Sequence, residues 1–204
     1  MLERARALGF TGVLIGNLGH LPLVRGLNFH LYGDYGLNVF NSRSLAYLKD
    51  KELESACVSF ELRFAQIRDL KKVLRAEAIV YGRLPLMITE NCLVQNETGC
   101  RLDRQGPCVP EDGPCRCGQP NVLVDRTGAA FPLLPAYGHR TEIQNSKPLY
   151  LADRPEHRRL GLAYARLRFT TETAEECVSV VQNYLDAAPA AGDFTRGLYE
   201  RGVE

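Results

Sequence analysis

Short apolar runs alternate with amphipathic segments along the first ninety residues. The runs 13–17, 29–33, 56–60 and 78–82 are almost continuously apolar, which is typical of strands in a sheet covered on both faces. Between them, segments 42–49 and 64–74 carry apolar residues at helical spacing, and a shorter helical segment is expected at 21–27. Strands that recur about every 20–25 residues with helices between them predict parallel β/α units.

The pattern breaks within residues 88–150, where Pro and Gly become frequent. Two β-rich runs, 121–124 and 130–134, flank the turn Asp125-Arg126-Thr127-Gly128 and predict a β-hairpin. A short helix at 155–160, a strand at 164–170 and a helix capped by Thr171 or Thr173 follow. We therefore divide the chain into β/α barrel units (1–87), a cysteine-rich insertion with the hairpin (88–150), a final β/α unit (151–186) and a C-terminal tail (187–204).

Polar side chains follow the ends of the predicted strands. In a β/α barrel the carboxyl ends of the strands form one rim, and that rim carries the chemistry. Each such residue taken alone is often a cap or a turn residue, but the set predicts a site. We assign catalytic roles to His20, Glu61 and Glu90, which can move protons, and substrate contacts to Asn17, Asp34, Asn38 and Arg83.

Five of the seven cysteines lie between residues 92 and 117, in the spacing Cys92-x7-Cys100-x7-Cys108-x6-Cys115-x-Cys117. Disulfides, zinc and an iron–sulfur cluster are the chemical explanations for such density. The chain has 204 residues, is 45% hydrophobic, and shows neither a secretory signal nor an apolar stretch long enough to cross a membrane. A reducing cytoplasm is therefore expected, where clustered thiols more often bind metal than form disulfides. Cys57, in a strand, and Cys177, in a helix, are expected to be small buried side chains.

The net charge and the absence of certain motifs argue against some classes of function. With 25 basic and 24 acidic residues the formal charge is +1, so no overall basic field draws the chain to nucleic acid. No His-Glu-x-x-His zinc motif and no Gly-x-Ser-x-Gly nucleophile motif occurs. Of the four histidines, His20 is the best catalytic candidate because it follows a strand end, whereas His30 and His157 suggest structural or exposed positions.

A series of motifs resembles the C-terminal part of a known family, in order and over essentially the whole chain. The motifs are Gly16-Asn17-Leu18-Gly19-His20, Gly33-Asp34-Tyr35-Gly36-Leu37-Asn38-Val39-Phe40-Asn41-Ser42, Tyr81-Gly82-Arg83-Leu84-Pro85-Leu86-Met87, Thr89-Glu90-Asn91-Cys92, Asp125-Arg126-Thr127-Gly128, Asn145-Ser146-Lys147-Pro148-Leu149-Tyr150-Leu151-Ala152-Asp153 and Phe194-Thr195-Arg196-Gly197-Leu198-Tyr199. They are similar to the collagenase-like peptidases of family U32. Each motif alone is weak, but the series is specific.

The resemblance implies an α/β fold, a partial TIM-like (β/α) barrel with a small cysteine-rich β-hairpin insertion. It also implies a 4Fe-4S cluster bound by Cys92, Cys100 and one of Cys115 or Cys117. For the fourth ligand three options stay open: His139 in the run Tyr137-Gly138-His139-Arg140, both Cys115 and Cys117, or Cys108. Asn145 and Lys147 are expected to close the site from the insertion.

The resemblance implies rival functions. One is oxygen-independent hydroxylation of RNA bases or a quinone ring, and another is hydrolysis of collagen-like peptides. The low strand count adds a third possibility, a non-catalytic, zinc-stabilised partner half of a split barrel. A full barrel has about 250 residues, and the sequence predicts only five of its strands. We therefore expect a partner that supplies the missing barrel half, either another chain or a second copy, with RNA as a further candidate partner.

Overall fold

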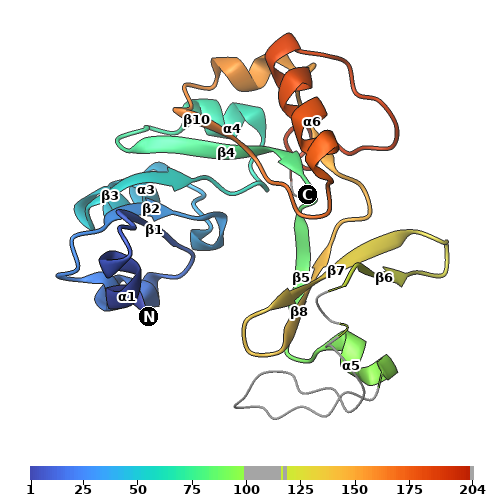
Figure 1. Ribbon diagram of the computed structural model, residues 1–204. Coiled ribbons are helices and arrows are strands. Elements are labelled where there is room, and N and C mark those ends of the chain that lie inside the picture. Colours follow the sequence, from blue (N-terminus) through green and yellow to red (C-terminus); the bar gives the residue numbers. More distant parts are fainter. Residues whose placement is uncertain (99–115, 117–118, 203–204) are drawn as a thin grey trace.

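The computed structural model describes residues 1–98, 116 and 119–202, which form two sheets (Figure 1). The larger sheet has the strand order β1-β2-β3-β4-β10, and all neighbours on this path are parallel. Its strands are β1 (Gly12–Ile15), β2 (His30–Gly33), β3 (Leu53–Cys57), β4 (Arg75–Gly82) and β10 (Tyr164–Leu167). The short strand β9 (Leu149–Tyr150) pairs antiparallel with the end of β4. The predicted parallel β/α units are therefore confirmed.

Helices precede, connect and follow the parallel strands. They are α1 (Leu2–Ala7), α2 (Leu21–Val24), α3 (Ser42–Asp50), α4 (Phe64–Asp69) and α6 (Ala174–Asp186), with the 3-10 helices η1 (Leu18–His20), η2 (Tyr35–Leu37) and η4 (Pro155–Arg159). Two starts follow the expected capping chemistry. The Asn41 side chain accepts hydrogen bonds from the backbone N–H groups of Arg43 and Ser44, both at 3.0 Å. Thr173 and Glu176 form a reciprocal capping box at the start of α6.

The main core lies between the parallel sheet and its helices. Leu45 of α3, Ile67 of α4 and Ile79 of β4 are fully buried there. The C-terminal tail returns to this core: the Tyr199 hydroxyl donates to the backbone carbonyl of Ile79 at 2.6 Å. Arg196 makes two hydrogen bonds, of 2.6 and 2.8 Å, to the Asp153 carboxylate. The tail is thus part of the fold, although the sequence assigned no element to it.

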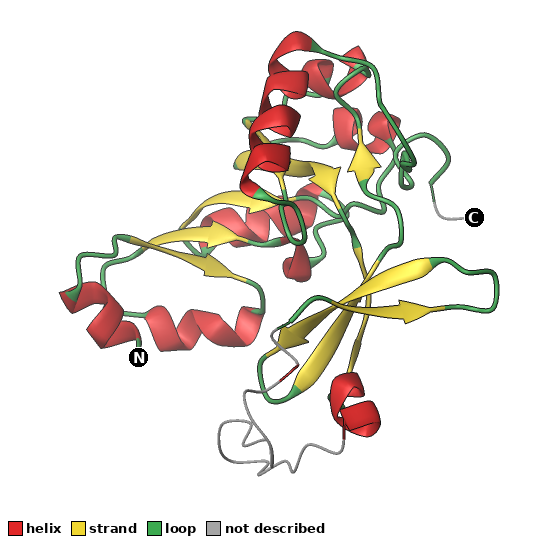
Figure 2. Ribbon diagram, turned by 45° about the vertical axis from the view of Figure 1, so that its right-hand side comes forward, coloured by secondary structure: helices red, strands yellow, loops and turns green. Residues whose placement is uncertain are grey.

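The second sheet is antiparallel, in the order β5-β8-β7-β6 (Figure 2). Its strands are β5 (Pro85–Thr89), β6 (Asn121–Val124), β7 (Ala130–Ala136) and β8 (Arg140–Gln144), and helix α5 (Leu93–Thr98) follows β5. The predicted hairpin is present as β6 and β7. Its turn is built by Asp125, whose carboxylate accepts from the N–H groups of Thr127 and Ala129 at 2.8 and 3.0 Å. Cys100, Cys108, Cys115 and Cys117, on which the cysteine-rich part of that prediction depends, lie outside the described residues.

Within the described residues the parallel sheet is open, with β1 and β10 at its edges, and it does not close into a barrel, which agrees with the expected partial barrel. The bounds of some elements differ from those predicted. Residues 37–40 do not extend β2, because η2 includes Leu37 and Val39 makes only an isolated parallel bridge to Val58. Helix α4 ends at Asp69, since the backbone of Leu70 is already extended. No helix among the described residues is both long and apolar enough to cross a membrane.

Candidate functional site

The carboxyl ends of the parallel strands meet along one edge of the larger sheet. Asp34 directly follows β2, and its backbone N–H donates to the carbonyl of Ile15 in β1 at 2.8 Å. Arg83 directly follows β4, and Arg168 directly follows β10. The rim expected from the sequence is therefore present as one side of an open sheet.

An ion cluster occupies the concave side of this sheet. Arg166 of β10 donates to the Asp34 carboxylate at 2.5 Å and also contacts the Glu77 carboxylate. The side chains of Asp34, Glu77 and Arg166 are 22, 14 and 21% exposed. β3 and β4 separate β10 from β2, and adjacent strands lie about 4.8 Å apart. A direct contact between Arg166 and Asp34 therefore requires the sheet to curl as a barrel wall does.

A second cluster joins the two sheets. Arg168 donates to Gln144 and Glu142 of β8, both at 2.7 Å, and its guanidinium lies 5.6 Å from the centre of the Tyr35 ring. Arg168 also donates to the backbone carbonyl of Arg83 at 2.8 Å. Every one of these partners sits at the carboxyl-end side of the parallel sheet. The antiparallel sheet is thus fixed against the rim by a nearly buried guanidinium.

Burial shifts the proton affinities of this region. It raises the pKa of Glu77, and the neighbouring Arg166 only partly offsets that effect. It raises the pKa of the Tyr35 hydroxyl, and the Glu142 charge adds to the shift. It raises the pKa of the fully buried Cys57 thiol to about 12. Cys57 is therefore a neutral thiol near neutral pH, as its predicted core position implied.

Asn17, Asn38 and His20 lie where the strand-to-helix loops begin. The Asn17 side chain caps η1 by accepting from the N–H of Gly19 at 2.7 Å, and Asn38 ends η2 in the left-handed conformation. Both are exposed, as is His20 at the end of η1. The local geometry accounts for the two asparagines as caps, while His20 has its imidazole open to solvent at the rim.

Arg83, Asn145 and Lys147 bind other parts of the chain. Arg83 donates to the backbone carbonyls of Asn145, at 3.0 Å, and of Ser146. The Asn145 side chain accepts from the N–H of Lys147 at 3.1 Å, and the Lys147 ammonium lies 2.8 Å from the Asp193 carboxylate. The three residues hold the crossing between β8 and β9 against β4 and the tail. The sequence offered no sign of these backbone partners.

The two candidate glutamates fall in different places. Glu61 follows β3 at the rim and is half-buried, and its N–H donates to the Ser59 hydroxyl at 3.3 Å. Glu90 lies instead beyond the end of β5 that is farther from the parallel sheet (Figure 1), where its 86% exposed carboxylate lies 3.8 Å from Arg140. The structure therefore brings Glu61, but not Glu90, to the rim.

The candidate metal ligands that the structure describes share that far end. Cys92 immediately precedes α5 and is 6% exposed, and its sulfur is in no disulfide. Strand β5 pairs Thr89 with Thr141 of β8, so the segments leading to Cys92 and His139 leave the sheet at the same end. Cys100, Cys115 and Cys117 lie outside the described residues, and the described ones contain no group of three possible ligands.

Sequence reasoning missed Arg166, Arg168, Glu77 and Glu142. A signal was present, because Arg166 and Arg168 alternate along an otherwise apolar strand, and alternate residues face the same side. Glu77 likewise interrupts the apolar run of β4.

Two burial expectations were wrong. His157, expected on an exposed helix, is buried, and burial lowers its pKa. Cys177 is half-buried rather than buried.

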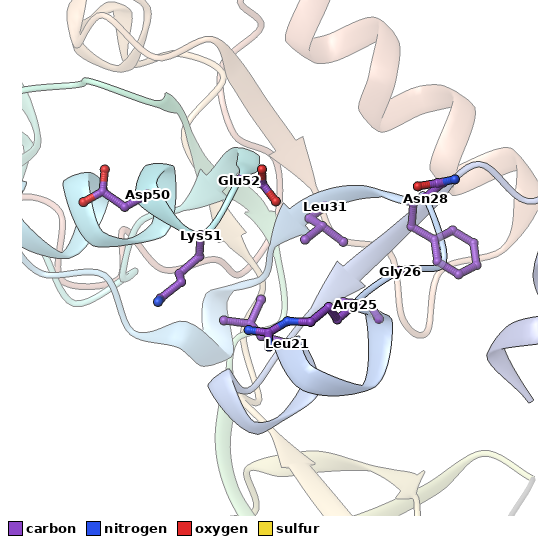
Figure 3. Close-up of a pocket in the computed structure, with 10 residues that line it drawn as sticks. Leu21, Arg25, Gly26, Asn28, Leu31, Asp50, Lys51 and Glu52 are labelled. Atoms are coloured by element: carbon purple, nitrogen blue, oxygen red, sulfur yellow. The ribbon is translucent and has the colours of Figure 1, made fainter.

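A separate cavity of about 350 Å³ lies at the opposite, amino-end side of the sheet, between α2 and the loops that precede β2 and β3 (Figure 3). Arg25, Asn28, Lys51 and Glu52 contribute its polar lining. Asn28 and Glu52 are in the left-handed backbone region. The Lys51 ammonium nitrogen lies over the Tyr47 ring, 5.2 Å from its centre. None of the predicted site residues lines this cavity, which is therefore separate from the candidate site.

Comparisons with known proteins bear on the family. Searches of curated proteins and of solved structures each gave no match. A family model described as peptidase family U32 matches residues 1–123, from α1 through the parallel strands β1 to β4 and into β6. The match covers more than half of the chain and agrees with the motif series at the strand ends. The chain therefore belongs to peptidase family U32.

Proposed function

We propose that this chain is an iron–sulfur enzyme that hydroxylates an RNA base or a quinone ring without molecular oxygen, with a co-substrate that supplies the oxygen atom and accepts the two electrons of the oxidation. The observation that carries the proposal is Cys92, a buried thiol outside any disulfide, at the start of the cysteine-dense segment. A 4Fe-4S cluster would be held by Cys92, Cys100, Cys115 and Cys117, with His139 or Cys108 as the alternative fourth ligand. Thiolates are the usual protein ligands of such clusters, and histidine replaces them in some.

The thiolates of this set suit the chemistry of the group, and the two described members start from one end of the antiparallel sheet. Cys92 lies between β5 and α5, and the N–H of Leu93 donates to the Thr141 hydroxyl at 3.1 Å, which fixes the backbone beside it. His139, in the turn that leads into β8, starts from the same end of the antiparallel sheet. When bound, the cluster supplies one-electron chemistry or an open iron site. It would also hold together a sheet with a small core of its own.

At the rim, Glu61 and His20 are the residues that we propose to move protons to and from a substrate. Both lie after strand ends, where His20 is exposed and Glu61 is half-buried. Arg168 and Arg166 position the surrounding carboxylates and the Tyr35 ring. Further parallel strands from a second chain would complete the curled sheet around this rim. A reducing cytoplasm is the setting in which we expect the thiolates to persist.

Peptide hydrolysis is the second candidate, because the matching family is described as a peptidase family. His20 and Glu61 are the polar residues available for it at the rim. Cys57 is not a suitable nucleophile, since its thiol is fully buried with a pKa of about 12. A zinc-stabilised, non-catalytic module is the remaining alternative, because the same thiolates bind zinc.

Anaerobic purification with iron, sulfide and zinc quantified tests the proposal. We expect iron and sulfide together and a brown protein that bleaches on reduction. Cys92→Ala should lose the colour, whereas Cys57→Ala and Cys177→Ala, matched removals of a thiol elsewhere, should keep it. Zinc without iron or sulfide would reject the cluster in favour of the structural module.

Gelatin cleavage separates the two enzyme functions. We expect little or none from the purified chain. If it cleaves gelatin, and either His20→Ala or Glu61→Gln abolishes the cleavage, the peptidase function replaces the cluster enzyme. His30→Ala is the control, because His30 pairs with Glu54 at the amino-end side of the sheet, away from the rim.

A further inference from the structure

Both ends of the parallel sheet are open in the described part of the chain. β1 pairs only with β2, and β10 pairs only with β4. The two strands point the same way, because every step between them is parallel. A β-strand edge with free backbone groups and apolar flanks favours association with another strand.

The helices at the two ends are also incompletely covered. Among the described helices, α3 and α4 bury side chains such as Leu45 and Ile67, whereas α1 and α6 bury none. On α6, Val178, Val181 and Leu185 are 70, 41 and 70% exposed, at the spacing of one helix face. At the other end, Leu8, Phe10 and Leu14 are 69, 60 and 53% exposed.

A groove of about 360 Å³ runs between α6 and the outer edge of β10. Leu162, Ala165, Val181 and Leu185 give it an apolar lining. The tail that follows α6 does not fill it, because Thr195 pairs with Leu149 of β9 and Tyr199 reaches Ile79 of β4. The groove therefore accepts side chains from a strand added beside β10.

We propose that this strand is β1 of a second copy of the chain. Because β1 and β10 run in the same direction, β1 of the second copy extends the sheet in parallel without reversing. The curl of the sheet, seen in the contact between Arg166 and Asp34, lets two copies meet at both junctions and close into a ring. Each copy then covers the β10 edge of its partner with its own β1 edge.

Charge and position support a second copy as the occupant. α6 follows β10 and α1 precedes β1, so both helices run opposite to the strands and both end at the amino-end side of the sheet. The charged residues of α6 are all acidic, namely Glu175, Glu176 and Asp186, whereas α1 carries Arg4 and Arg6 with a single Glu3. At the junction, Leu185 and Asp186 at the end of α6 meet Leu8 and the basic end of α1.

This inference rests on the proposed completion of the sheet, and sedimentation and light scattering of the anaerobically purified chain test it. We expect a dimer. Leu14→Lys, on the β1 edge, and Leu185→Lys, on α6, should each weaken it by about tenfold or more. Val122→Lys is the matched control, since Val122 is 56% exposed on the antiparallel sheet, away from both edges. Circular dichroism confirms that all three variants fold.

The sharpest test mixes two of these variants. A junction made of two different edges predicts that the Leu14→Lys and Leu185→Lys variants, mixed together, regain one intact junction and dimerise better than either alone. Asp186→Arg should weaken the dimer, and Arg4→Glu in the other copy should restore part of the loss. A monomer at all concentrations, sensitivity to Leu185→Lys without sensitivity to Leu14→Lys, or failure of the mixed variants overturns the proposal. Iron and sulfide measured on the same variants report on the cluster separately, so loss of the dimer with retained iron rejects this inference alone.

Discussion

The two sheets of this molecule are held together by different interactions. The parallel sheet packs against its helices through a continuous core in which Leu45, Ile67 and Ile79 are fully buried. The antiparallel sheet buries fewer large side chains, such as Leu133 and Ile143, and leaves Leu86 and Ile88 of β5 more than half exposed. Its firm connections to the rest of the described chain are polar, through Arg168 and Arg83.

Buried apolar area stabilises a fold by about 25 cal/mol per Å², so the parallel sheet has its own source of stability. The antiparallel sheet depends on its polar contacts and, by our proposal, on the group that its cysteines bind. Changes to packing should therefore unfold the parallel sheet, while changes to Arg168 or to bound metal should loosen the antiparallel sheet first. Four substitutions test this difference.

Gly82→Ala should have the largest effect. Gly82 ends β4 with a φ of +118°, and an added Cβ would lie 2.0 Å from the backbone carbonyl oxygen of Arg168. Neither backbone can move without breaking the pairing of β4 with β10. We expect a loss of about 4 kcal/mol or more in the free energy of unfolding, measured by urea denaturation, with both sheets lost together.

Gly128→Ala is the control for that substitution. Gly128 also has a positive φ, +85°, but nothing lies within 4 Å of an added Cβ. Only the backbone cost remains, about 1 kcal/mol. If the two substitutions cost the same, close packing at the end of β4 is not what holds the parallel sheet.

Arg168→Met should separate the two sheets. The Arg168 side chain is 17% exposed, and its loss leaves the Glu142 carboxylate, 14% exposed, without its cation. We expect the chain to lose about 3 kcal/mol of stability and hydrogen exchange to accelerate in β7 and β8 before β3 and β4. Arg68→Met is the control, because the Arg68–Asp69 pair is exposed and should contribute nothing measurable. Uniform acceleration in both sheets would contradict the comparison.

Local chemistry predicted much of this fold. The cap of α6 at Thr173, one of the two positions predicted for it, the Asp125 turn and the five parallel strands depend on neighbours in sequence, and each was predicted from them. The ends of strands and helices were less accurate, because tertiary packing decides where α4 stops and where β3 begins.

The candidate site was less predictable because its contacts join distant residues. Arg166 and Asp34 are 132 positions apart and meet only because the sheet curls. Arg168 reaches Glu142 only because the antiparallel sheet folds back on the rim. Strand ends could be placed from the sequence, but the backbone carbonyls that engage Arg83 could not, since any residue presents the same carbonyl.

Tyr199→Phe tests whether the tail belongs to the parallel core. The hydroxyl donates to the Ile79 carbonyl at 2.6 Å, and both groups are buried. Removing it leaves that carbonyl without this donor and should cost about 1–2 kcal/mol. Tyr137→Phe is the control, since Tyr137 is 93% exposed and should show no change. Equal stability of Tyr199→Phe and the unaltered chain would mean that the tail is only loosely attached.

Glu77→Gln should have the smallest effect and should act through pH. Burial raises the pKa of Glu77 above the ordinary value of 4.5. As the pH rises from that value through the pKa of the folded state, the unfolded chain loses its proton first, so the folded chain binds more protons and its stability falls. Glu77→Gln removes this fall, and the stability difference between the two proteins should change across that window and be constant above it.

Glu54→Gln should behave oppositely, because the hydrogen bond from His30 lowers the pKa of Glu54 and adds stability that is lost as the pH falls. Urea denaturation from well below pH 4 up to pH 8 covers both windows, and identical slopes for the two variants would show that the carboxylate on the concave side is no more buried than the one at the amino-end side.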